Sequence, residues 1–184
     1  MRLNPDFEIV PGFYSPDDSW EIYQCLLHEH HWPTNRYYLA GREFVLPRLQ
    51  TWHADAGYSN NLLETRPWTP LLSRVRAKIE GFLGFAFNSV LVNCYRDGQD
   101  YVGWHADNES ELGEQPLIAS LSFGVARSFE FKHKKTAMHD WILLSPGTLL
   151  IMQPNFQRHW LHRVPIEAHI TQSRINMTFR KVVL

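Results

Sequence analysis

Cysteine is scarce in this sequence: only Cys25 and Cys94 occur, far apart in the chain. A small disulfide-stapled fold needs several closely spaced cysteines, so this class of protein is excluded and a reducing environment is indicated. Long apolar runs are missing as well, since no segment approaches the roughly 20 consecutive apolar residues of a membrane-spanning helix. We therefore expect a soluble protein with no membrane partner, located in the cytoplasm or, in a eukaryote, in the nucleus.

The chain also lacks an excess of charge of either sign, because its formal net charge is −1. Attraction to a polyanion would have to come from local groups of cations and not from the field of the whole protein. Two such groups are candidates for contacts with phosphates: Arg36, Arg42, Arg48 and Lys132, Lys134, Lys135. Repeats, low-complexity tracts and linkers are absent too, so we expect one domain over 1–184.

Two helices are predicted in the first half of the chain. Each begins with a hydroxyl N-cap followed by proline at the first helical position, in Ser15-Pro16 and in Thr69-Pro70. We expect Gly81 and Gly84 to mark the end of the second helix. Short strands and turns are expected between the helices, over 33–67.

From residue 89 onward the pattern changes to short β-rich runs separated by turns. The predicted strands are 89–95, 101–105, 117–126, 128–133, 139–144, 147–152, 158–164 and 174–182. Many short strands after two helices predict an α+β fold, a double-stranded β-helix (jelly roll) with packed N-terminal helices. Its core would lie at about 89–184.

Two His-x-Asp pairs occur in the chain, His53-Ala54-Asp55 and His105-Ala106-Asp107. An isolated pair of this kind is more often a surface strand than a metal site. In the second pair the residues follow an extended run, so both side chains would point to one face. Two histidines and a carboxylate bind non-haem Fe(II) on one face and leave other positions open. We select the second pair because further candidate ligands follow it in the chain.

The third ligand has two candidates, His159 and His162. On a strand, a spacing of three residues places them on opposite faces, so only one can face the pair. The residues alone do not decide between them. A zinc site among the other histidines is a weaker alternative.

The run 174–180 alternates polar and apolar residues in strict period two. Arg174 and Arg180 share its polar face with their Cα atoms roughly 20 Å apart, and side chains leaning inward leave room for a five-carbon dicarboxylate. Asn93 and Tyr95 share a face of the strand before the His-x-Asp pair and could donate hydrogen bonds to its carboxylates. Together these residues indicate an iron oxygenase that depends on 2-oxoglutarate.

At this point the motifs match a known family. The chain resembles the AlkB family of Fe(II)/2-oxoglutarate-dependent nucleic-acid demethylases, especially members similar to the mammalian duplex-DNA repair enzymes, over about 36–182. The matching motifs are Asn93-Cys-Tyr95-Arg-Asp-Gly, Gly103-Trp-His105-Ala-Asp107-Asn-Glu109, Ile118-Ala-Ser-Leu-Ser-Phe-Gly124, His159-Trp-Leu-His162 and Arg174-Ile-Asn-Met-Thr-Phe-Arg180.

The resemblance implies a role for each matching residue of the site. His105, Asp107 and His162 would bind the iron, with His159 as a nearby supporting residue. Arg174 would pair with the distal carboxylate of 2-oxoglutarate. The end of 2-oxoglutarate on the metal side would contact Arg180 and Asn93. The site would be lined by Tyr95, Asn176 and Thr178.

For the substrate, the resemblance implies a flipped base held between Tyr58 and His105. Asn108 and Glu109 would contact the nucleotide, and Leu39 lies where duplex-reading members insert an apolar wedge. The implied activity is oxidative demethylation of 1-methyladenine or 3-methylcytosine in DNA, with release of formaldehyde. The implied cofactors are Fe(II), 2-oxoglutarate and O2, with ascorbate as a reductant.

Residues 1–88 would then hold the helices and a nucleotide-recognition lid, and we expect a monomer.

Two other functions stay open. One is a 2-oxoglutarate oxygenase acting on RNA, a protein, a lipid or a small molecule. The other is a non-catalytic jelly-roll binding module in which the histidines are structural.

Overall fold

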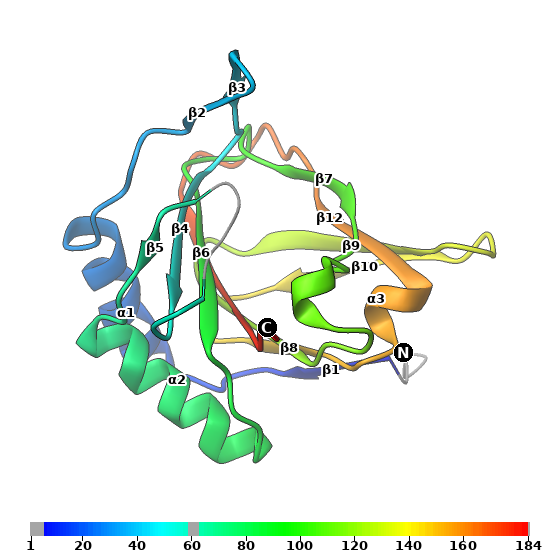
Figure 1. Ribbon diagram of the computed structural model, residues 1–184, viewed down its shortest axis with the longest axis horizontal. Coiled ribbons are helices and arrows are strands. Elements are labelled where there is room, and N and C mark those ends of the chain that lie inside the picture. The colour runs from blue at the N-terminus through cyan, green and yellow to red at the C-terminus, as the bar shows by residue number, and fades with distance from the viewer. Residues whose placement is uncertain (1–5, 59–62, 184) are drawn as a thin grey trace.

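The architecture is that of two β-sheets facing each other, seen in a computed structural model that describes residues 6–58 and 63–183 (Figure 1). The larger sheet has the order β1-β11-β8-β13-β6-β4-β5 and the smaller one β10-β9-β12-β7. The strands of the larger sheet are β1 (Phe7–Val10), β11 (Leu149–Met152), β8 (Ile118–Gly124), β13 (Arg174–Arg180), β6 (Ser89–Tyr95), β4 (Leu49–Ala54) and β5 (Thr65–Arg66). Those of the smaller sheet are β10 (His139–Leu144), β9 (Arg127–His133), β12 (Trp160–Val164) and β7 (Val102–His105). The predicted jelly roll is confirmed.

Both predicted helices are present, α1 (Pro16–His28) and α2 (Pro70–Leu83). The hydroxyl oxygens of Ser15 and Thr69 each accept a hydrogen bond from a backbone N–H in the first turn, at 3.2 Å, as their N-cap role requires. The prediction for Gly81 was wrong, because α2 continues through it to Leu83. Gly84 ends the helix with a left-handed φ of 63°, a conformation that glycine adopts without a Cβ clash.

The helices lie against the outer face of the larger sheet (Figure 1). Alternate residues of β13, namely Ile175, Met177 and Phe179, are fully buried in this helix-facing core. The polar residues of β13 must then face the space between the two sheets, because successive side chains of a strand alternate. A second apolar cluster, which includes Phe129, Phe131 and Leu150, fills part of that space.

Two expectations about the organisation of the chain need correction. The segment 1–88 is not only helices and a lid, because β1, β4 and β5 join the same sheet as the later strands. The predicted strand 158–164 begins instead with a short helix, α3 (Phe156–His159), and β12 starts at Trp160. Local β-propensity does not reveal that the chain must turn there before it enters the sheet.

A separate hairpin formed by β2 (Arg36–Leu39) and β3 (Arg42–Val45) stands out from the sheets at the top of Figure 1. It exposes Tyr38, Phe44 and Val45 to solvent. Leu39 pairs with Arg42 at the end of this hairpin, and its side chain lies outside the described residues. Among the described helices, none combines the length and apolar character needed to cross a membrane.

Candidate metal centre and co-substrate pocket

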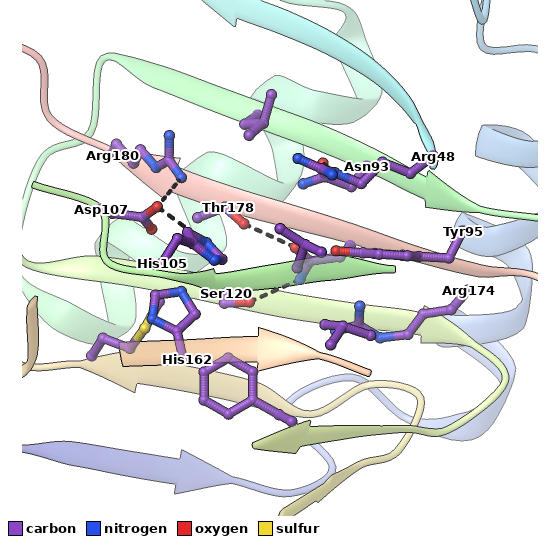
Figure 2. Close-up of a pocket in the computed structure, with 16 residues that line it drawn as sticks. Arg48, Asn93, Tyr95, His105, Asp107, Ser120, His162, Arg174, Thr178 and Arg180 are labelled. Carbon is purple, nitrogen blue, oxygen red and sulfur yellow. Dashed lines mark hydrogen bonds and ion pairs between the residues drawn. The ribbon is translucent and has the colours of Figure 1, made fainter. Parts of the chain in front are cut away.

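His105, Asp107 and His162 come together between the two sheets. His105 and His162 are directly paired across β7 and β12, with ring centroids 4.2 Å apart. Asp107 follows β7, and its Oδ1 lies 3.7 Å from Nε2 of His105. One candidate ligand atom from each residue lies within 4.8 Å of the others, and in the described part of the chain no other group of three such residues converges in this way. Figure 2 shows the three side chains turned toward one another at one end of a pocket.

The Asp107 carboxylate is buried and paired with a cation. Nη2 of Arg180 donates to its Oδ1 at 2.9 Å, and both side chains are nearly inaccessible to solvent. Burial acts to raise the pKa of Asp107, but Arg180, His162 and His105 outweigh it, so the pKa lies below its usual value. The carboxylate is therefore held in the ionised form that a metal ligand requires.

His162 is held neutral by its surroundings. Its ring packs against Phe129 and Phe156, with centroids 5.2 and 5.7 Å away. Burial, together with the neighbouring His105, lowers the pKa of His162 to about 3. Its Nδ1 is buried and has no hydrogen-bond partner among the described residues. A neutral imidazole is the form that binds a metal.

The polar face of β13 forms one wall of the pocket. Nδ2 of Asn176 donates to the Ser120 hydroxyl at 2.8 Å, and the Thr178 hydroxyl donates to Oδ1 of Asn176 at 2.9 Å. These side chains are locked to one another and to β8, which places them in fixed positions along the pocket. The predicted two-faced character of this strand is confirmed by the burial of the alternate residues on its opposite face.

Arg174 lies at the opposite end of the pocket from the three candidate ligands (Figure 2). It is buried, donates through Nη2 to the Ser122 hydroxyl at 2.9 Å, and has its guanidinium 5.4 Å from the ring centroid of Tyr95. None of the described residues lies in hydrogen-bonding geometry with its Nε or Nη1. Burial lowers the pKa of Arg174 to about 10, which still leaves it a cation at neutral pH. A buried cation with unused donors is suited to an anionic ligand.

Comparison with known proteins assigns this arrangement to a family. The model of the 2OG-Fe(II) oxygenase superfamily matches residues 6–180. DNA oxidative demethylase ALKBH2 from cattle (Bos taurus) is 37% identical over 98% of this chain and 69% of its own length. The chain belongs to the AlkB family of this superfamily. The resemblance noted from the motifs is confirmed.

Two further relatives place this AlkB-family chain among its homologues. Alpha-ketoglutarate-dependent dioxygenase alkB homolog 3 from rat (Rattus norvegicus) is 37% identical over 95% of this chain. The chain spans 63% of the length of that relative, just under two thirds. The solved structure of OsALKBH1 covers 98% of the chain with a TM-score of 0.63 and 19% identity, which supports the shared fold alone.

Fe(II), 2-oxoglutarate and O2 are the cofactors of this superfamily, and the AlkB-family pocket has donors that fit the first two. Two imidazoles and one carboxylate form the donor set that suits non-haem Fe(II). The unused N–H groups of Arg174 suit a carboxylate, and the Nε of Arg180 is likewise buried without a partner. The pocket between these ends is lined by the residues predicted for 2-oxoglutarate: Asn93, Tyr95, Asn176 and Thr178.

Three residues of this AlkB-family site were missed by reasoning from the sequence. Arg48 lines the pocket and donates from Nε to Oδ1 of Asn93 at 3.1 Å, although we had expected it to contact phosphates. Ser120 also lines it. The third is Gln157, whose Oε1 accepts from the backbone N–H of Asp107 at 2.8 Å. The polar residues at alternate positions of β8 were a usable signal for Ser120, whereas nothing local pointed to Gln157.

The residues predicted to bind the substrate do not converge on one point as the candidate metal ligands do. Asn108 and Glu109 are exposed directly after Asp107. Tyr58 packs against an apolar cluster that includes Trp52 and Leu112, and does not line the described pocket. The residues after Tyr58, 59–62, lie outside the described part of the chain.

His159, the alternative third ligand, turns away from the AlkB-family site. Its Nδ1 lies 3.3 Å from Oδ2 of Asp6, and its ring is next to His133. The helical turn of α3 gives it this direction, which the assumption of a continuous strand could not foresee. Lys134 also has a contact that the sequence did not reveal, because its ammonium donates to the backbone oxygen of Gln157 at 2.7 Å.

Proposed function

We propose that this chain is an Fe(II)/2-oxoglutarate-dependent dioxygenase that removes methyl groups from N-alkylated bases of DNA, of the 1-methyladenine and 3-methylcytosine type. The observation that carries the proposal is the convergence of His105, Asp107 and His162 at one end of a pocket whose other end holds Arg174. The relatives named DNA oxidative demethylase ALKBH2 support the substrate class. The chain would act as a monomer, in the cytoplasm or nucleus, with ascorbate as a reductant.

The residues of the pocket have distinct tasks in this proposal. His105, Asp107 and His162 would hold the iron, and Arg174 would fix the distal carboxylate of 2-oxoglutarate. Arg180 keeps the Asp107 carboxylate ionised and oriented by the hydrogen bond between them. When bound, the iron with 2-oxoglutarate and O2 supplies the oxidising power that hydroxylates an N-methyl group, whose hydroxymethyl product releases formaldehyde.

The remaining residues of the pocket would orient the co-substrate and keep water out. Asn93 accepts a hydrogen bond from Nε of Arg48 at 3.1 Å, so its side chain is fixed before any ligand arrives. Asn176 and Thr178 are fixed in the same way by their bonds to each other and to β8. Preorganised polar groups of this kind need not rearrange during the reaction.

The substrate would meet the exposed rim beside the metal centre. Glu109 is exposed two residues after Asp107, so its carboxylate can approach a cationic base presented to that centre. Opposite charges attract more strongly as water is excluded, which would favour a methylated, positively charged base over an unmodified one. Tyr58 and Asn108 remain predicted contacts of the flipped nucleotide, and Leu39 remains the position predicted for the apolar wedge.

The test is release of formaldehyde and succinate from an oligonucleotide that carries 1-methyladenine, with Fe(II), 2-oxoglutarate and O2. We expect both products from the wild type and from Asp55→Ala, and neither from Asp107→Ala, because only Asp107 faces the two histidines. Succinate without formaldehyde would instead indicate an oxygenase of another substrate, such as RNA, a protein, a lipid or a small molecule. If no co-substrate is consumed, the proposed function is wrong.

A further inference from the structure

Gln157 is a buried polar residue in contact with the candidate metal centre. It lies in α3, fifty positions after Asp107 in the chain, and only 2% of its surface is exposed. Oε1 of Gln157 accepts from the backbone N–H of Asp107 at 2.8 Å. Its Nε2 faces Sδ of Met152 at 3.4 Å. The amide is therefore oriented by one strong bond, with its oxygen toward Asp107.

The backbone of Asp107 needs such a partner. The strand β7 ends at His105, and the pairing of His105 with His162 is the last register of β7 with β12 on that side. Asp107 therefore has no strand ladder to bind its N–H, although it is buried. An unsatisfied buried N–H costs about 1–3 kcal/mol, and without this bond the segment would also be free to rotate.

The carboxylate and the backbone of Asp107 are fixed from two directions. Arg180 of the larger sheet holds the side chain, and Gln157, which leads into the smaller sheet, holds the main chain. His162 follows Gln157 closely in the chain, on β12. A shift of Gln157 relative to β12 would therefore move one candidate ligand with respect to another.

Lys134 anchors Gln157 from a third element. Its Nζ donates to the backbone oxygen of Gln157 at 2.7 Å, and its own N–H donates to the oxygen of His159 at 2.8 Å. The helix α3 has only four residues, and no side chain caps its N-terminus. The carbonyl groups at the end of a helix have no N–H of the same helix to bind, and Lys134 supplies the donor for that of Gln157.

We propose that Gln157 is a positioning residue of the metal centre, which orients Asp107 through its backbone, and that Lys134 holds Gln157 in place. This inference rests on the proposed function for the identity of the centre. It assigns Lys134 to the support of the site. Two hydrogen bonds thus connect Lys134, which follows β9, through Gln157 in α3 to Asp107.

The experiment is an anaerobic titration of the intact chain with Co(II), followed by its visible absorption, on four variants. Gln157→Met keeps the length of the side chain but removes the acceptor, and we expect about 10–100-fold weaker binding. Gln157→Glu keeps an acceptor oxygen and should remain close to the wild type. Lys134→Met should weaken binding less than Gln157→Met does. Lys78→Met is the matched control, because its Nζ also donates to a backbone oxygen, that of Phe13, far from the site.

A second readout is the hydrogen exchange of the Asp107 backbone amide in the metal-free protein, followed by NMR. We expect slow exchange in the wild type and in Gln157→Glu, and fast exchange in Gln157→Met. Wild-type Co(II) affinity and slow exchange in Gln157→Met would overturn the proposal. If the wild type bound no Co(II), the proposed function would fail, while the exchange data would still decide the role of Gln157. If Gln157→Met does not fold, unchanged binding and exchange in Lys134→Met would overturn the coupling.

Discussion

The two His-x-Asp pairs of this chain are identical in their three residues yet lie in very different surroundings. Each aspartate pairs with an arginine, Asp55 with Arg76 at 2.8 Å and Asp107 with Arg180 at 2.9 Å. The Asp55 side chain is 40% exposed, whereas that of Asp107 is 5% exposed. Asp55 also accepts a hydrogen bond from the indole of Trp68. Its partners are therefore Arg76 of α2 and Trp68, just before that helix.

Among the described residues, a buried histidine nitrogen without a partner occurs in the first pair as well as at the candidate metal centre. Nδ1 of His53 bonds to the backbone oxygen of Pro67, and its Nε2 is buried without a partner. His162 also has a buried nitrogen without a partner. An unsatisfied histidine nitrogen is thus no sufficient mark of a metal ligand. What distinguishes the second pair is that a buried carboxylate and another histidine converge on the same point.

The sharpest contrast should come from replacing the histidine of each pair in turn, because metal stabilisation is expected to be lost in one variant and kept in the other. We expect Mn(II) to raise the melting temperature of the wild type and of His53→Ala, and to leave that of His105→Ala unchanged. Binding to the folded state alone stabilises a protein by about 2.7 kcal/mol at a ligand concentration 100 times Kd. Thermal unfolding with and without excess chelator measures this. A metal-dependent shift that disappears in His53→Ala would reverse the assignment of the two pairs.

The two arginine partners should differ in their contribution to stability. Arg180→Met leaves the buried Asp107 carboxylate without its cation, which should lower the free energy of unfolding by about 3–5 kcal/mol. Arg76→Met affects a more exposed pair, for which we expect about 1 kcal/mol. Urea unfolding of the metal-free proteins compares them. Equal losses would show that burial does not separate the two pairs.

A third contrast should be a dependence of stability on pH that arises from the buried histidines His30 and His53 beside the first pair. Burial, with His53, Arg66 and His31, lowers the pKa of His30 to about 4, and burial also lowers the pKa of His53. The unfolded chain then binds more protons than the folded one below pH 6.5, so stability should decrease as the pH falls from 6.5 toward 4.

His30→Gln should reduce this acid sensitivity. The comparison is the free energy of unfolding by urea at several pH values between 4 and 7. His169→Gln serves as a control, since His169 is exposed. If the stability of the wild type and of His30→Gln depended equally on acid pH, the effect could not be assigned to His30.

Structural features that depend on a few neighbouring residues could be predicted from the sequence. The helix starts followed from hydroxyl caps and prolines, and the two faces of β13 followed from strict alternation. Pairing between segments that are far apart in the chain could not be predicted in this way. That β4 lies next to β6, or that Gln157 meets Asp107, depends on how the sheets close, and no local periodicity encodes it. The choice between His159 and His162 depended likewise on a single helical turn.

The strict alternation of β13 has a consequence for the kinds of change this chain can tolerate during evolution. One face of this strand belongs to the core under the helices, and the other carries Arg174 and Arg180. Inserting or deleting one residue in the strand would exchange the two faces, placing cations under the helices and apolar side chains in the pocket. Substitutions can accumulate singly here, but a change in length would destroy the core and the pocket in one step.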